Sequence, residues 1–86
     1  MTVTAFSAAP NVLIRAARGS DGAALGRLAQ LDSARVPAGD LIVAETDGTL
    51  VAAHSPQARA SIADPFRPTA DVVRLLEVRG AMMRAA

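Results

Sequence analysis

The chain has 86 residues, of which 51% are hydrophobic, 20% are charged and 2% are aromatic, and its formal net charge at pH 7 is +1. This composition predicts one small globular domain with a core of Val, Leu, Ile, Ala and Met. The nine basic residues, all Arg, alternate with eight acids and form no basic run, so we expect no nucleic-acid partner. Cys is absent, so we expect no disulfide and no metal site.

Residues 1–10 read as a flexible tail that ends at Pro10, and residues 11–86 as a single domain. The tail lacks the basic segment and the long apolar segment of a signal peptide. No apolar run in the chain approaches the ~20 residues that span a bilayer. We therefore expect a cytoplasmic protein that has no contact with membranes. The abundance of Ala and Arg without any Lys is typical of a GC-rich bacterial genome.

The first two elements predicted are a strand and a helix. Residues 11–17, NVLIRAA, form a short β-branched and aliphatic run that is typical of a strand. Ser20 is the expected N-cap of the following helix, with Asp21 in its first turn. One face of this helix is apolar and carries Ala24, Leu25, Leu28 and Leu31. Residues 33–39 are predicted to be a loop.

A β-hairpin is predicted next, with strands at 41–46 and 49–54. The two runs are joined by Asp47-Gly48, which suits the two-residue turn whose positions need positive φ. Both strands are apolar at consecutive positions, so both faces of the sheet should be covered. Residues 58–64 are expected to be a weaker fourth strand.

The final helix is predicted over residues 70–84, after a turn that contains two prolines, with Thr69 as its N-cap. Its broad apolar face carries Val72, Leu75, Leu76, Val78, Met82 and Met83. Its other face carries Asp71, Arg74, Glu77, Ala81 and Arg84. The order β-α-β-β-β-α predicts an α+β fold, in which two helices pack on a four-stranded antiparallel sheet with its strands in sequential order.

LIRAARGSDGAALGRLAQLD is the predicted first strand with its helix, and LIVAETDGTLVAA is the predicted hairpin. These two segments resemble the N-terminal half of a GCN5-related N-acetyltransferase domain: the first is similar to the family's first strand and helix, and the second to its next two strands. With the last helix, the resemblance covers about residues 12–84. It implies a fold that binds acetyl-coenzyme A through a loop leading into a helix. Arg67 fits the first position of the family's loop motif, and Leu75-Leu76 fits the Leu pair in its helix.

The loop also departs from the family motif. Ala70 and Val72 stand where the family has small residues, usually Gly, and Pro68 removes one N–H donor. The family's later strands have no counterpart in these residues. The resemblance therefore implies a truncated acetyltransferase-like domain with a degenerate loop, in which Arg67, Thr69 and Ala70 are the positions left for cofactor contact.

No catalytic residue is predicted from the polar side chains. His54 ends a strand without a positioned partner, so we expect a surface His or one bonded to a neighbour. Glu45 is expected to be a solvated strand charge. Asp64 and Arg67 are expected to pair across the turn around Pro65, as a turn stabiliser more than as an anion site.

Arg79 lies almost at the centre of the predicted apolar face of the last helix. Two interpretations remain open: its stem packs while its charged head reaches water, or it pairs with a carboxylate in its own or a second chain. The strand at 58–64 is expected to be an open sheet edge. A homodimer would cover this edge and the helix. The predicted interface residues are Leu75, Leu76, Arg79, Met82 and Met83.

Three functions follow as hypotheses. The first is a non-catalytic, acetyltransferase-like module that binds itself or an unknown protein partner, with no cofactor. The second is an N-acetyltransferase that uses acetyl-coenzyme A in a cleft completed by a second chain. The third is a regulatory module that binds a small anion through Arg67 and the helix N-terminus. The missing loop glycines favour the first, without transferase activity.

Overall fold

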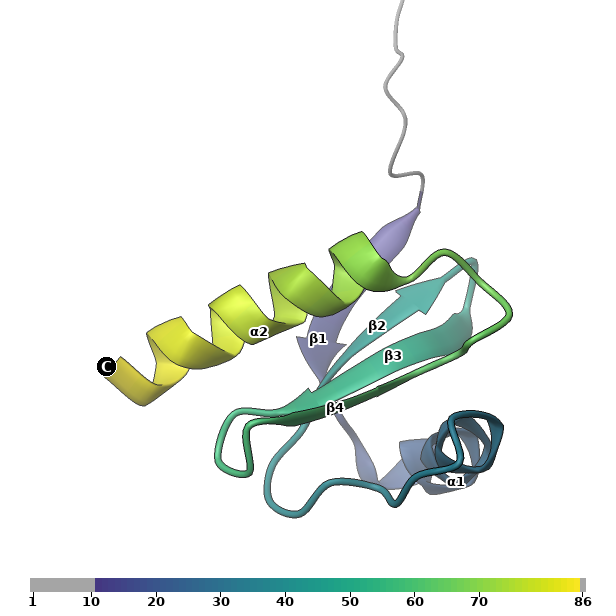
Figure 1. The fold of residues 1–86 in the computed structure, drawn as a ribbon, viewed down its shortest axis with the longest axis horizontal. Coiled ribbons are helices and arrows are strands. Elements are labelled where there is room, and N and C mark those ends of the chain that lie inside the picture. Colours follow the sequence, from purple (N-terminus) through teal and green to yellow (C-terminus); the bar gives the residue numbers. More distant parts are fainter. Residues whose placement is uncertain (1–10, 86) are drawn as a thin grey trace, which may run out of the picture.

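The computed structural model describes residues 11–85, so the tail predicted for residues 1–10 lies outside the described part. Four strands form one antiparallel sheet in the order β1-β2-β3-β4, with helices on both sides (Figure 1). The fold is α+β with the order β-α-β-β-β-α, which confirms the fold prediction. The elements are β1 Val12–Ala16, η1 Gly19–Asp21, α1 Gly22–Leu31, β2 Ile42–Thr46, β3 Thr49–Ser55, β4 Ala60–Ala63 and α2 Ala70–Ala85.

The hairpin of β2 and β3 turns at Asp47 and Gly48, as predicted. Both residues have positive φ, 51° and 83°, which matches a two-residue turn that follows the twist of the strands. Asp tolerates this conformation because its short polar side chain bonds locally, and Gly has no Cβ to clash. The turn therefore fixes the register of the two central strands.

A β-bulge in β3 interrupts the alternation of its side chains between the two faces of the sheet. Glu45 pairs with Leu50 while Ala44 pairs with Ala52, so Val51 is an extra residue on β3. As a result, Val51 and Ala52 both face the α2 side of the sheet, and Leu50 faces the α1 side. The alternation of side chains is interrupted at this point, and the strand contributes to two cores.

The core under α1 joins Leu25, Leu28 and Ala29 to the sheet residues Val43, Leu50, Ala53 and Ile62. This confirms the predicted apolar face of α1, although Leu31 is only half-buried. The prediction of Ser20 as N-cap is wrong. Ser20 lies in the 3-10 turn η1, and Asp21 stands at the N-cap position. The Asp21 carboxylate accepts a hydrogen bond from the Arg18 N–H at 2.7 Å, which stabilises the 3-10 turn before α1.

The core under α2 lies on the opposite face of the sheet. Leu76 is fully buried there against Ile42, Ala44, Val51 and Ala52. The helix crosses mainly β3 and β2, so Val12 and Ile14 of β1 stay half-buried at the margin of this core (Figure 1). Neither face of the sheet is left bare, which confirms the prediction that both faces are covered. Among the described residues, no helix is long and apolar enough to cross a membrane.

Strand β4 is an edge strand, as predicted, but its edge is not fully open. The Ala63 N–H points away from β3 and donates to Asp32 Oδ2 at 3.1 Å. Asp32 follows the last residue of α1 and stands at its C-cap. Its carboxylate therefore ties the end of α1 to the sheet and occupies one edge donor.

Candidate functional site

The loop before α2, which carries the residues left for cofactor contact, is held together by contacts among its own residues. Asp64 is buried, and its Oδ1 accepts the Phe66 N–H at 2.9 Å. Its Oδ2 lies 3.5 Å from Nε of Arg67, which confirms the predicted pair across the turn. The charge of Arg67 is thus directed at Asp64, in its own loop, so the structure favours a turn stabiliser over an anion site.

Thr69 and Ala70 stand at the start of α2, as predicted. The Val73 N–H donates to the Thr69 carbonyl at 2.8 Å, which makes Thr69 the residue that opens the helix. Asp71 lies in the first turn and already places a negative charge at the helix N-terminus. A phosphate at this end would meet that carboxylate, and the bend has no glycine to let it approach the backbone closely.

His54 is buried, not exposed, and it lies between β4 and α2. Its Nδ1 is 2.7 Å from Ser61 Oγ and hydrogen-bonded to it, as one of the two predicted environments requires. Its Nε2 is also buried and has no hydrogen-bond partner among the described residues. The ring fits there because residue 80 is Gly: a Cβ at Gly80 would lie 2.7 Å from both Cδ2 and Nε2 of His54. Gly80 therefore sets how closely α2 approaches the sheet.

An ion network covers β1 on the α1 side of the sheet. Arg15 donates to both carboxylate oxygens of Asp21, at 2.8 and 3.0 Å, and its Nε donates to Glu45 at 3.0 Å. Glu45 is consequently half-buried and paired, so the prediction of a solvated charge is wrong. The hydrogen bonds from Arg15, and then that from the Arg18 N–H, hold the pKa of Asp21 well below its usual range. The network joins β1, β2 and the turn before α1.

We expect Asp21→Asn to lower the melting temperature at neutral pH. Because the folded-state pKa of Asp21 is depressed, its stabilisation is complete above the unfolded value of about 3.9 and declines as the pH falls below it. Thermal denaturation of both proteins between about pH 3 and pH 7 tests this. The gap between parent and variant should be widest at neutral pH and should narrow at acid pH. Asp47→Asn, in the exposed hairpin turn, is the control and should change little. An equal gap at every pH would contradict the role of the Asp21 charge.

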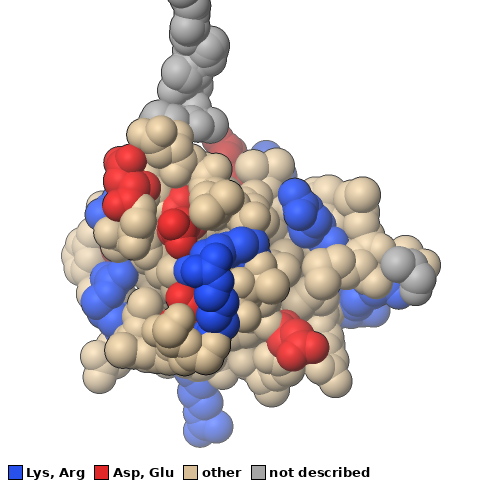
Figure 2. All heavy atoms as spheres, turned by 180° about the vertical axis from the view of Figure 1, so that it is seen from behind, with Lys and Arg blue, Asp and Glu red and all other residues tan. Residues whose placement is uncertain are grey.

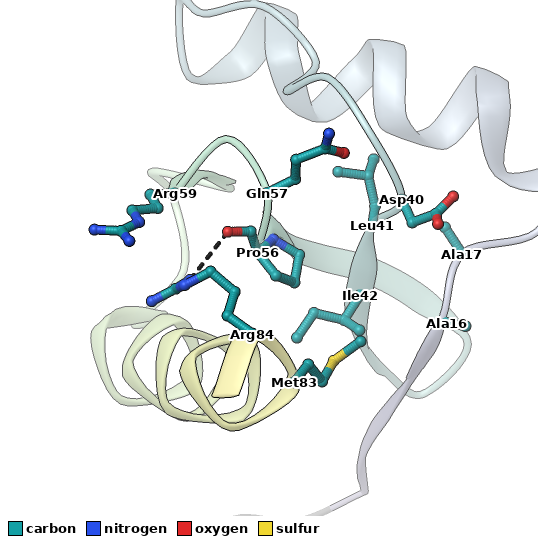
Figure 3. A pocket seen from close by; sticks show the side chains of 10 residues that line it. All are labelled: Ala16, Ala17, Asp40, Leu41, Ile42, Pro56, Gln57, Arg59, Met83 and Arg84. Atoms are coloured by element: carbon teal, nitrogen blue, oxygen red, sulfur yellow. Dashed lines mark hydrogen bonds between the residues drawn. The ribbon is translucent and has the colours of Figure 1, made fainter. Parts of the chain in front are cut away.

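An open pocket of about 860 Å³ lies at the C-terminal end of α2 (Figure 3). Met83 and Ile42 provide apolar walls, Arg59 and Arg84 lie on one side, and Asp40 lies on the other. Arg84 is already engaged, because its Nη1 donates to the Pro56 carbonyl at 3.0 Å. The pocket and the predicted cofactor residues are thus at opposite ends of α2, about 20 Å apart along a helix of this length.

Charged side chains form no large single-sign patch on the face drawn in Figure 2, where acidic and basic residues are interspersed. In the part of the chain that the structure describes, no group of three potential metal ligands occurs. The face drawn in Figure 2 therefore presents no cluster of like charges to a strongly charged ligand.

Four of the seven exposed large hydrophobic side chains in the described residues are on α2, and their positions revise the predicted interface. Leu75, Val78 and Met82 are 54%, 55% and 65% exposed and follow one line of the helix, which we call the α2 stripe. Leu76, by contrast, is 0% exposed, so its assignment to an interface is wrong: it belongs to the core of its own chain. Met83 is half exposed and lines the pocket.

Arg79 is exposed and lies beside the stripe, not at the centre of the buried face. The sheet-facing side of α2 is centred on Leu76 and Gly80, and Val72 and Val73 flank it. The prediction averaged over all apolar residues of the helix and so pointed between the true core and the stripe. Among the described residues Arg79 makes no ion pair, which leaves open the prediction of a carboxylate in a second chain.

No known protein family, no curated protein and no solved structure matches this chain.

Proposed function

We propose that this chain is a non-catalytic, acetyltransferase-like domain that works by associating with itself. The observation that carries the proposal is the α2 stripe. Three large apolar side chains stand in water along one side of a helix whose neighbouring Leu76 is completely buried. Exposed apolar patches of this kind mark interaction surfaces in small soluble proteins.

The small size of the core adds to this argument. Each core is made of aliphatic side chains, since the chain has only two Phe and no Tyr or Trp. One of these aromatic residues, Phe66, is 81% exposed and contributes little to the fold. A domain of this length buries only about 60% of its unfolded surface, so association would add a meaningful part of its stability.

The loop before α2 supports the non-catalytic part of the proposal. A cofactor loop needs free N–H groups and an approachable backbone to hold a pyrophosphate. Here the Phe66 N–H is bonded to Asp64, residue 68 is Pro, and Arg67 is paired with Asp64. The loop is thus occupied by its own contacts.

We expect the chain to be a homodimer at micromolar concentration, and Leu75→Asp to convert it to a folded monomer. The reason is that a carboxylate on the stripe would have to be buried without a partner in the dimer. Light scattering over a dilution series measures the mass, and circular dichroism checks the fold. Ala23→Asp, at an exposed position of α1 on the other side of the sheet, is the control and should remain dimeric. A parent protein that is monomeric throughout the series would refute self-association.

A further inference from the structure

The α2 stripe is flanked by one acid and one base at matching distances. Asp71, Leu75 and Arg79 are spaced four residues apart, and all three are exposed. In an α-helix this spacing places Asp71 and Arg79 about 6 Å before and after Leu75 along the axis, and each about 40° from it around the helix. Leu75 is therefore the midpoint of a short pattern, negative, apolar, positive, on one side of the helix.

Such a pattern is complementary to itself under a two-fold axis. When two identical helices lie antiparallel with Leu75 against Leu75, residue 71 of one falls opposite residue 79 of the other, and the reverse pair forms at the same time. Both pairs then join a carboxylate to a guanidinium. A parallel arrangement would instead place like charges side by side.

We propose that the α2 stripe binds the α2 stripe of a second copy, antiparallel and centred on Leu75, with Asp71 of each copy paired to Arg79 of the other. This inference rests on the proposed self-association and specifies its surface and register. Leu75 forms the apolar centre and Val78 extends the contact on each side of it, whereas Met82 lies opposite residue 68, just before the start of the other helix. The two ion pairs stand at the rim, where they select orientation and register more than they add affinity.

The orientation of the stripe leaves room for this contact. Met83 lies next to Ile42 and lines the same pocket as Ala16 of β1, whereas Arg84 on the other side reaches the Pro56 carbonyl in the turn between β3 and β4. At 100° per residue, Leu75 and Met82 lie on the Met83 side of α2, which is turned toward β1. Within residues 11–85 no other helix lies beside α2 there, and Val12 and Ile14 are only half-buried.

Charge reversal tests the register directly. We expect Asp71→Arg alone and Arg79→Asp alone to weaken the dimer at least about tenfold, because each homodimer would then contain two like-charge pairs. An equimolar mixture of the two variants should dimerise like the parent, since both cross-chain pairs become attractive in the heterodimer. Sedimentation equilibrium measures the dissociation constants, and circular dichroism confirms that each variant is folded. Glu77→Arg, on the helix side away from the stripe, is the matched control.

The outcomes separate this inference from the function on which it rests. Monomeric single variants and a dimeric mixture support the proposed pairing. Single variants that dimerise as tightly as the parent, or a mixture that stays monomeric, overturn the pairing while self-association stands. A parent that never dimerises, tested alone, refutes both.

Discussion

Replacing Gly80 by Val is expected to destabilise the protein by about 3 kcal/mol, which is a large fraction of the total free energy of unfolding of a domain of this size. The new Cβ would lie 2.7 Å from the His54 ring, and the ring cannot easily turn away, because Nδ1 is held by Ser61 and the side chain is buried between β4 and α2. Pro56 closes the space on another side, with its Cβ at 3.4 Å. The helix must therefore lift from the sheet.

Thermal or urea denaturation measures this effect, with a fall in melting temperature of more than about 10 °C expected. The matched control is Gly26→Ala in α1, where an added Cβ meets nothing within 4 Å. That substitution should stabilise the protein by up to about 1 kcal/mol, because Ala has the higher helix propensity. If Gly80→Val were as stable as the parent, α2 would not be seated on His54 as described.

The second large effect distinguishes two neighbouring leucines. Leu76→Ala should cost about 2–5 kcal/mol, because it removes a fully buried side chain from the core between α2 and the sheet. Leu75→Ala, one residue earlier and 54% exposed, should change the stability of the dilute, monomeric protein by no more than about 0.5 kcal/mol.

The pair is informative because both substitutions have the same chemistry and the same helix propensity change. Chemical denaturation at low protein concentration gives both free energies of unfolding. Equal losses at the two positions would mean that the face of α2 is assigned wrongly. A loss at Leu75 that grows with protein concentration, by contrast, is what self-association through the stripe requires.

The fold could be predicted from the sequence because its strongest signals are local. Asp47-Gly48 fixes a hairpin by backbone conformation alone, and the runs on either side give the strands. Given this hairpin, the simplest sheet for the order of elements is one whose strands are neighbours in sequential order, as the structure has it. The bulge at Val51 had no such signal, since an apolar run has the same composition with or without an extra residue.

The surface features were predicted less well, because they depend on tertiary contacts. A helical wheel of α2 shows one broad apolar face. The close packing of Gly80 against the His54 ring decides which part of that face is buried. Glycine has no side chain to weigh in such a pattern, so the sequence offered no sign of its role. The ion network of Arg15 was also unforeseen, because its partners Asp21 and Glu45 come from separate elements.

The carboxylate of Asp32 on the edge of β4 has a consequence for how this protein behaves when crowded. An intruding strand would have to displace a charged acceptor from the Ala63 N–H before it could pair there. Fibril-like growth by strand addition is therefore discouraged at this position, where β4 is also short, although its residues are uncharged.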